Sequence, residues 1–208
     1  MSRHLRALKI ENTRGKRVFP LLSISGVLTE SISMMEEDEI WDCYDIDRNK
    51  TGRVMRRGDP IRDGDYHLVV HACVIDPMGR MLIQKRTEDK AGWPGMWDVT
   101  MGGSAIAGET SRDAAKRELW EEIGLDVDLC GVKPNLSVNY RHNFDDFFIL
   151  RQSCDIAFLR LQAEEVSDAR WAGRDEIHRM IDDGSFIPYF HSLIDTIFDL
   201  CENENGIN

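Results

Sequence analysis

The chain has 208 residues, of which 42% are hydrophobic and 30% charged, and its formal net charge is −11. This length suits one domain with a substantial core, and the negative charge argues against a nucleic-acid-binding or membrane-surface protein, both of which need a basic face. No apolar run approaches the roughly 20 residues of a membrane span. The five cysteines show no C-x-x-C spacing, which is typical of reduced thiols in a cytoplasmic protein and not of a disulfide framework or zinc site.

The N-terminal segment differs in composition from the rest of the chain. Residues 1–20 are rich in Lys and Arg and poor in acids, and a Ser- and Leu-rich stretch follows. The segment lacks an apolar core with a cleavage site, so we do not interpret it as a signal peptide, although a transit peptide has a similar composition. We expect residues 1–34 to be a disordered or non-native extension. Residues 35–208 would then form a single domain.

Strand patterns begin after this segment. Residues 39–58 alternate around polar residues and predict two strands joined at Asn49–Gly52. Residues 66–75 are almost continuously apolar, which is typical of a buried strand, and residues 80–86 predict the strand that returns beside it. The sequence therefore predicts an N-terminal hairpin followed by the centre of a sheet.

Two histidines lie within the buried strand. His67 and His71 are four residues apart, so they lie on the same face of that strand. Histidines in such positions are either metal ligands or ordinary packed side chains, and the second case is the more common.

Two cations, Lys85 and Arg86, end the returning strand. Both are candidates for binding the phosphate oxygens of a substrate, and Arg can do so in bidentate fashion. The alternative is a pair of surface charges with no ligand.

The most informative stretch is residues 102–125. Its second half predicts a helix over 110–123, because Thr110 is a suitable N-cap with Asp113 three residues later, a variant of the capping box. Gly124 stands where a helix normally ends. One side of this helix is apolar and consists of Ala115, Leu119 and Ile123.

Three acids share the neighbouring side of the helix. Glu118, Glu121 and Glu122 are spaced i, i+3 and i+4, and like charges at that spacing destabilise a helix. A bound cation would remove this repulsion, and clustered carboxylate oxygens suit Mg²⁺ or Mn²⁺. A merely solvated acidic face is the alternative.

The spacing around these acids follows a fixed pattern. Gly103 is followed after five residues by Glu109, and after seven more by Arg117 and then E-L-W-E-E-I-G-L. Residues 103–125 thus resemble the Nudix box, G-x5-E-x7-R-E-U-x-E-E-x-G-U with U apolar, and match it at every specified position. Seven positions demand one residue type, so at about one in twenty each, coincidence is a poor explanation.

This resemblance extends from about Trp41 to Phe190 and has implications for fold and activity. It implies an α/β (α+β) fold, a Nudix-type α/β/α sandwich with a mixed sheet. The N-terminal hairpin extension is similar to that of Nudix proteins related to isopentenyl diphosphate isomerase. It also implies a hydrolase for a nucleoside diphosphate linked to another group. In this family Glu109 and Arg117 would pair and fix the glycine loop to the helix.

The resemblance also implies the remaining site residues. Glu118 and Glu122 would be ligands of Mg²⁺ or Mn²⁺, and the Gly103 carbonyl would complete the coordination shell. Glu121 would be a further ligand or would hold the attacking water. Glu118 and Glu121 are accordingly the predicted catalytic residues.

Further strands and helices are expected after the box. Strands are predicted in 126–132 and 135–150, with a turn or rim at Asn143–Asp146, and a strand or loop over 151–161. A short strand ending at Trp171 and a helix over 174–182 follow. An amphipathic helix is predicted after Pro188, and its apolar face consists of Phe190, Leu193, Ile194, Ile197 and Phe198. Glu164 and Glu165 precede the strand that ends at Trp171. The family sometimes takes its general base from such a loop, but a solvated turn is the simpler interpretation.

Three functions compete on this basis. The favoured one is hydrolysis of a small diphosphate. The second is isomerisation of isopentenyl diphosphate, but those isomerases use a cysteine near a histidine ligand before the box, and residues 101–104 read M-G-G-S. The third is a nucleotide sensor without turnover, which usually accompanies a degenerate box. A small diphosphate is the expected partner, and a homodimer is possible although no sequence feature indicates one.

Overall fold

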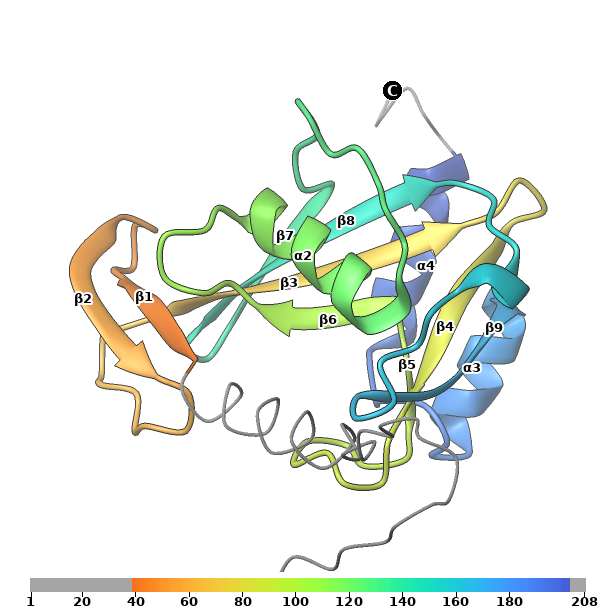
Figure 1. The fold of residues 1–208 in the computed structure, drawn as a ribbon, viewed down its shortest axis with the longest axis horizontal. Helices are drawn as coiled ribbons and strands as arrows, with labels where there is room; N and C mark the ends of the chain where they lie inside the picture. The colour runs from red at the N-terminus through yellow and green to blue at the C-terminus, as the bar shows by residue number, and fades with distance from the viewer. Residues whose placement is uncertain (1–38, 203–208) are drawn as a thin grey trace, which may run out of the picture. The chain divides into compact units, whose positions relative to one another are not determined.

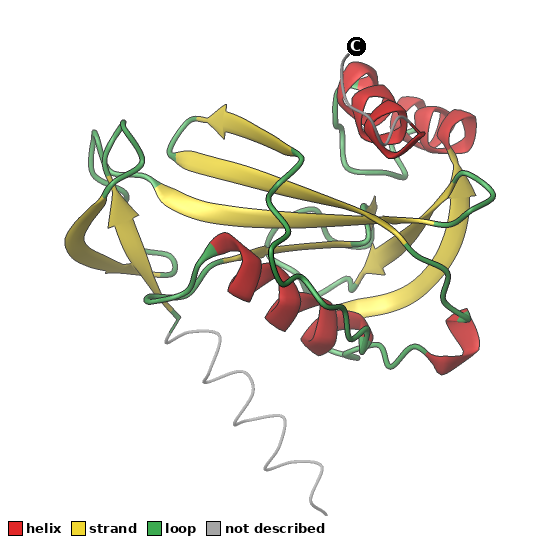
Figure 2. Cartoon of the chain, turned by 90° about the horizontal axis from the view of Figure 1, so that it is seen from above, coloured by secondary structure: helices red, strands yellow, loops and turns green. Residues whose placement is uncertain are grey.

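The computed structural model describes residues 39–202 and shows a mixed β-sheet with helices on both faces (Figures 1 and 2). The strands are β1 (Ile40–Tyr44), β2 (Lys50–Arg56), β3 (His67–Ile75), β4 (Arg80–Arg86), β5 (Trp97–Asp98), β6 (Met101–Ser104), β7 (Leu136–Tyr140), β8 (Asn143–Arg151) and β9 (Val166–Gly173). The helices are α2 (Ser111–Ile123), the 3₁₀ helix η1 (Ile156–Phe158), α3 (Arg174–Asp182) and α4 (His191–Glu202). The predicted α+β sandwich is confirmed. The predicted N-terminal extension lies outside the described residues.

Strand β3 is the centre of the main sheet, whose order is β5-β4-β3-β8-β7. It pairs in parallel with β8 along its whole length but meets β4 only at Ile75 and Met81. Beyond that point the two strands diverge, and β3 pairs with β6 while β4 pairs with β9. Among residues 39–202, β6 therefore has one strand partner and forms an edge of the sheet.

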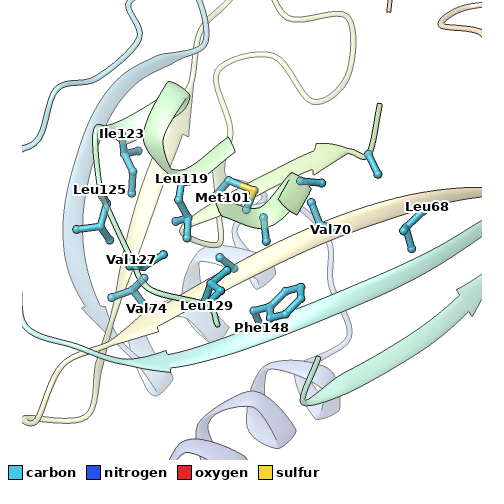
Figure 3. Close-up of a cluster of buried hydrophobic side chains, with 14 of the residues drawn as sticks. Leu68, Val70, Val74, Met101, Leu119, Ile123, Leu125, Val127, Leu129 and Phe148 are labelled. Atoms are coloured by element: carbon cyan, nitrogen blue, oxygen red, sulfur yellow. The ribbon is translucent and has the colours of Figure 1, made fainter. Parts of the chain in front are cut away.

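The alternation of side chains along β3 divides the core into two clusters. Val70 and Val74 face α2 and pack with Leu119 and Phe148 (Figure 3). Cys73 and Ile75 point to the opposite face and belong to the second cluster, which also contains residues of α3 and α4. A strand buried on both faces reads as continuously apolar, which is why the sequence pattern of β3 is so clear.

Helix α2 has the ends that the sequence predicts. The Thr110 hydroxyl accepts a hydrogen bond from the Asp113 N–H, and the Asp113 carboxylate accepts one from the Thr110 N–H. Gly124 ends the helix with φ 70°, in the left-handed region that favours glycine. These caps fix where the helix begins and ends and therefore which residues face the sheet.

Two predicted elements are wrong because apolar alternation does not require a strand. Residues 126–132 form a loop, although Val127 and Leu129 are buried in the core beneath α2. Asn143–Asp146 lies inside β8 and not at a turn. The β7–β8 turn is at Arg141 and His142, and Arg141 has a positive φ of 51°.

Two smaller boundaries also differ. The β1–β2 connection spans residues 45–49 instead of Asn49–Gly52, since the Asp45 carboxylate accepts hydrogen bonds from the backbone N–H groups of Asp47 and Asn49. Phe190 precedes α4 and is 80% exposed, so it does not belong to the apolar face of that helix.

The described residues bear on two expectations from composition. No helix within residues 39–202 is long and apolar enough to cross a membrane. All five cysteines are free thiols, as their spacing predicts.

Candidate active site

The candidate site begins where β6 lies against α2. A Cβ atom on Gly103 would lie 2.3 Å from Glu118 Oε1, far inside contact distance, so Glu118 occupies the space that any side chain at residue 103 would need. Gly103 pairs with Val70 of the central strand, which fixes its position. The box therefore requires glycine at this position because a carboxylate packs directly on its backbone.

Glu118 is a buried carboxylate beside a cation. Its Oε1 lies 3.0 Å from Arg117 Nη1, and only 9% of the residue is exposed. Burial raises the pKa of Glu118 to about 7, and the charge of Arg117 offsets only part of that effect. Keeping this carboxylate ionised in its buried position therefore costs free energy, and a second positive charge nearby would reduce that cost.

Glu122, one helical turn further along, is also buried. The Gln84 side-chain amide donates a hydrogen bond of 2.9 Å to Glu122 Oε2. Burial raises its pKa well above the ordinary value, and the charge of Glu118 adds to the shift. Within residues 39–202, no Lys or Arg forms an ion pair with Glu122. A buried carboxylate without a cation is costly, so this position favours a bound cation.

An ion pair fixes the glycine loop to the helix. Arg117 donates from Nε and Nη2 to the two oxygens of Glu109 at 2.8 and 3.0 Å, and also to the Ser104 carbonyl. Glu109 Oε2 accepts a further hydrogen bond from the Ile106 N–H. This is the pairing that the resemblance implies, and it sets the distance between β6 and the acids of α2.

Glu121 is more exposed than the other two acids and shares Arg117 with Glu118. Its side chain is 49% exposed and forms an ion pair of 3.0 Å with Arg117 Nη1. Within residues 39–202, no three His, Cys, Asp or Glu side chains converge in the arrangement of a metal site. The charge of Glu118 thus acts on Glu122, and Glu118 shares Arg117 with Glu121, whose side chain is half exposed.

The two predicted phosphate-binding cations separate. Arg86 donates to the Gly92 carbonyl and lies 3.8 Å from the buried Asp98 carboxylate, whose charge acts on Glu122. Lys85 follows the alternation of β4 and shares the face of Ile83, which packs with α3 and α4. Only Arg86 is therefore connected to the carboxylates of α2.

Asp98 is a site residue that the sequence reasoning missed. It is 3% exposed, accepts hydrogen bonds of 2.8 Å from the Tyr189 hydroxyl and the Val99 N–H, and burial raises its pKa. The sequence reasoning also missed Gln84. Gln84 meets Glu122, and Asp98 meets Arg86 and Tyr189, only when the strands are folded into the sheet. A polar residue inside an otherwise apolar strand, as in L-I-Q-K, is the signal that could have indicated Gln84.

The loop before β9 also reaches this site. The Gln162 N–H donates to the Glu122 carbonyl at the end of α2. Glu165 forms an ion pair with Lys90 and is largely buried, and its charge acts on Glu122. Residues 163–165 form a turn with Glu164 exposed, as the simpler interpretation predicted, but the Glu165 side chain is not solvated. The Thr87 hydroxyl donates to the Glu164 carbonyl and holds the loop in place.

Comparisons with known proteins agree with this geometry. The family model described as NUDIX domain matches residues 65–190. The chain is 41% identical over 162 residues to a protein of Listeria monocytogenes named as an uncharacterized Nudix hydrolase, an alignment that covers 78% of this chain and 95% of the relative. It is 30% identical over 155 residues to an isopentenyl-diphosphate Delta-isomerase of Cutibacterium acnes, covering 68% of this chain and 77% of the relative.

A solved structure shares the fold. The crystal structure of a protein from Deinococcus radiodurans aligns with a TM-score of 0.62 at 23% identity, covering 76% of this chain and 97% of that one. The match to the family model and the identity to relatives over most of their length, together with the intact box, lead to one conclusion: this chain belongs to the Nudix family and is a hydrolase that acts on phosphoric anhydrides.

Proposed function

We propose that the protein is a divalent-metal-dependent hydrolase that cleaves the diphosphate linkage of a nucleoside diphosphate-X or a related small organic diphosphate, with water as nucleophile. The observation that carries this proposal is the pair of buried carboxylates, Glu118 and Glu122, of which Glu122 has no ion-pair partner among residues 39–202. A cation between them would offset both the burial of charge and the repulsion between the two acids.

The donor set suits Mg²⁺ or Mn²⁺. Glu118, Glu122 and the Gly103 carbonyl would be the protein ligands, and Mg²⁺ commonly keeps several waters, so two carboxylates suffice. When bound, the ion supplies charge neutralisation for the phosphate oxygens and lowers the pKa of a coordinated water. The orphaned Gln84 Oε1, which is buried without a hydrogen-bond partner, supports this assignment because it could accept from such a water.

The other residues of the site would bind and orient the substrate. Arg86 would hold phosphate oxygens, with Asp98 fixing its guanidinium. Glu121 is our first candidate for general base, because its carboxylate is half exposed and water can reach it beside its ion pair with Arg117. Glu165 is the second candidate, and the deeper burial of its side chain and of its partner Lys90 argues against it.

One observation favours isomerisation of isopentenyl diphosphate: the chain is similar to a relative named as isopentenyl-diphosphate Delta-isomerase. Against it stands the segment Met101–Ser104, which contains neither the cysteine nor the histidine that those isomerases use. We therefore favour hydrolysis. The free thiols support a cytoplasmic location as part of the same proposal.

The test is a screen of diphosphate compounds with Mg²⁺ and Mn²⁺, in which the released products identify the bond that is cleaved. We expect phosphate or nucleoside monophosphate release that disappears in EDTA. Allylic product from isopentenyl diphosphate would instead establish the isomerase. Tight binding of nucleotides without release of any product would indicate a sensor and contradict the proposal.

A further inference from the structure

A second group of polar side chains lies on the face of the sheet opposite α2. His67 and His71 of β3 and Asp145 of β8 share this face, because Asp145 pairs with Val69, the residue midway between the two histidines. The carboxylate therefore lies between the two imidazoles. His71 Nε2 is 3.8 Å from Asp145 Oδ2, and the charge of Asp145 acts on His67.

Each of the three side chains has a buried polar atom without a hydrogen-bond partner. These atoms are His67 Nδ1, His71 Nδ1 and Asp145 Oδ1. His67 as a whole is only 7% exposed. Buried polar atoms in native proteins are almost always hydrogen-bonded, and leaving one unpaired costs the desolvation of that group. Three unpaired atoms on one face therefore mark a place where a water or a ligand supplies the hydrogen bonds.

Aromatic rings hold the two imidazoles in place. Trp41 stacks on His67 with ring centroids 4.4 Å apart and an interplanar angle of 8°. Phe147 stacks on His71 at 4.4 Å and 14°. The N-terminal hairpin, through Trp41, thus contributes one wall of this group. Burial lowers the pKa of His67 to about 4, so at neutral pH its ring has one donor and one acceptor nitrogen.

The group lies one residue along β6 from the proposed metal ligands. Gly102 pairs with His71, and a Cβ on Gly102 would lie 3.1 Å from His71 Nδ1 and 3.9 Å from Asp98 Oδ2. Gly103 is the next residue and packs on Glu118 on the opposite face. Because β6 has one strand partner within the described residues, a single ligand could reach both faces around its edge.

We propose that His67, His71 and Asp145 bind the organic group attached to the diphosphate, and that this group carries hydroxyl or N–H donors, as sugars and nucleobases do. This inference rests on the proposed function. A ligand with such donors restores hydrogen bonds to the unpaired atoms, whereas an isoprenoid chain restores none. Sites built to hydrogen-bond a substrate group discriminate strongly against analogues that lack it.

The substrate test compares three diphosphates: a nucleoside diphosphate with base and ribose, 5-phosphoribosyl 1-diphosphate with a sugar but no base, and isopentenyl diphosphate with neither. We expect kcat/KM for at least one of the first two to exceed that for isopentenyl diphosphate by about tenfold or more. Cleavage of both polar compounds assigns the sugar as the recognised group, and cleavage of the nucleotide alone assigns the base.

The variants Asp145→Leu and His67→Phe test the residues themselves. Each removes an unpaired polar atom, and phenylalanine keeps a ring against Trp41. We expect KM for the polar substrate to rise about tenfold, the effect of one lost hydrogen bond, while the melting temperature is unchanged or higher. Asp145→Asn keeps a carbonyl oxygen and should lose less. His191→Phe, at a half-exposed histidine outside the site, is the matched control.

The two proposals fail in different ways. Faster hydrolysis of isopentenyl diphosphate, or an unchanged KM in both variants, would overturn the assignment of this face while leaving metal-dependent hydrolysis intact. A wild-type protein that releases no product from any diphosphate would overturn the proposed function and this inference with it. A loss of stability in both variants with KM unaffected would show that the three residues are structural.

Discussion

Glu122 shows at the level of one residue how folding and function conflict. The residue is 5% exposed, receives one hydrogen bond from Gln84 and sits close enough to Glu118 for their charges to interact. If only stability mattered, a neutral side chain would be favoured at this buried position. Buried acids with raised pKa values are typical of functional sites, so the unfavourable position is itself evidence of a role.

Glu122→Gln should therefore separate stability from activity. The amide is neutral and of similar size, so the metal-free variant should unfold at the same or a higher temperature than wild type. Metal-dependent turnover should fall by about 100-fold or more, because a glutamine oxygen is a weak ligand for Mg²⁺. Thermal unfolding in EDTA and kcat across a Mg²⁺ titration measure the two effects. Glu176→Gln on α3 is the control, and normal activity in Glu122→Gln would refute the assignment.

Glu118 predicts an unusual dependence of stability on pH. Its pKa is about 7 in the folded protein against an ordinary value of 4.5. Between these pH values the folded state binds more protons than the unfolded state, so the free energy of unfolding should fall as pH rises from about 4.5 to about 7. At roughly 1.4 kcal/mol per pKa unit the loss is about 3 kcal/mol.

Urea unfolding in EDTA at pH 5 and pH 7.5 measures this loss. Glu118→Gln removes the titrating group, so its stability should change less over the same range. Asp76 and Asp113 have lowered pKa values, so they change the free energy of unfolding only at pH values below this range. Equal slopes for wild type and variant would show that Glu118 does not titrate as described.

Two elements, β6 and α2, determine the geometry of the proposed metal site. The capping box and Gly124 fix the length of the helix, and the Arg117–Glu109 pair fixes its distance from the loop. The glycine of β6 then allows Glu118 to pack on the backbone. All of these residues belong to the box, which is why a linear motif can encode them.

Gly103→Ala tests this contact between elements. The new Cβ would overlap the Glu118 carboxylate, which has to move because the strand backbone is fixed by its pairing with β3. We expect a folded protein with an activity at least about tenfold lower and a weaker apparent affinity for Mg²⁺. Gly173→Ala is the control, since nothing lies within 4 Å of its Cβ position. Wild-type kinetics in Gly103→Ala would contradict the role of this contact.

The whole molecule contributes what lies outside the box. Because β4 pairs with β9 and diverges from β3, it brings Gln84 against Glu122 of α2 and Arg86 beside Asp98. The loop before β9 is attached to the end of the same helix through Gln162. The site is thus assembled from segments about 80 residues apart in sequence.

Metal binding at such a site should stabilise the whole domain. A ligand that binds only the folded state adds about 2.7 kcal/mol to the free energy of unfolding at 100 times its dissociation constant. We expect Mg²⁺ to raise the melting temperature of wild type but much less that of Glu122→Gln. Because the net charge is −11, NaCl at equal ionic strength is needed as the control. Equal shifts with NaCl and MgCl₂ would indicate screening alone.

The sequence by itself determined the family, the boundaries of α2 and the strands β3 and β4, because caps and side-chain periodicity act between neighbouring residues. It could not place Asn143–Asp146 correctly or recognise 126–132 as a loop, since burial in a loop and in a strand leaves the same apolar alternation. Only the tertiary structure decided that Glu121 is half exposed while Glu118 and Glu122 are buried, that Arg86 lies beside Asp98, and that Gln84 contacts Glu122. Those outcomes depend on which strands pair, and pairing is set by contacts distant in sequence.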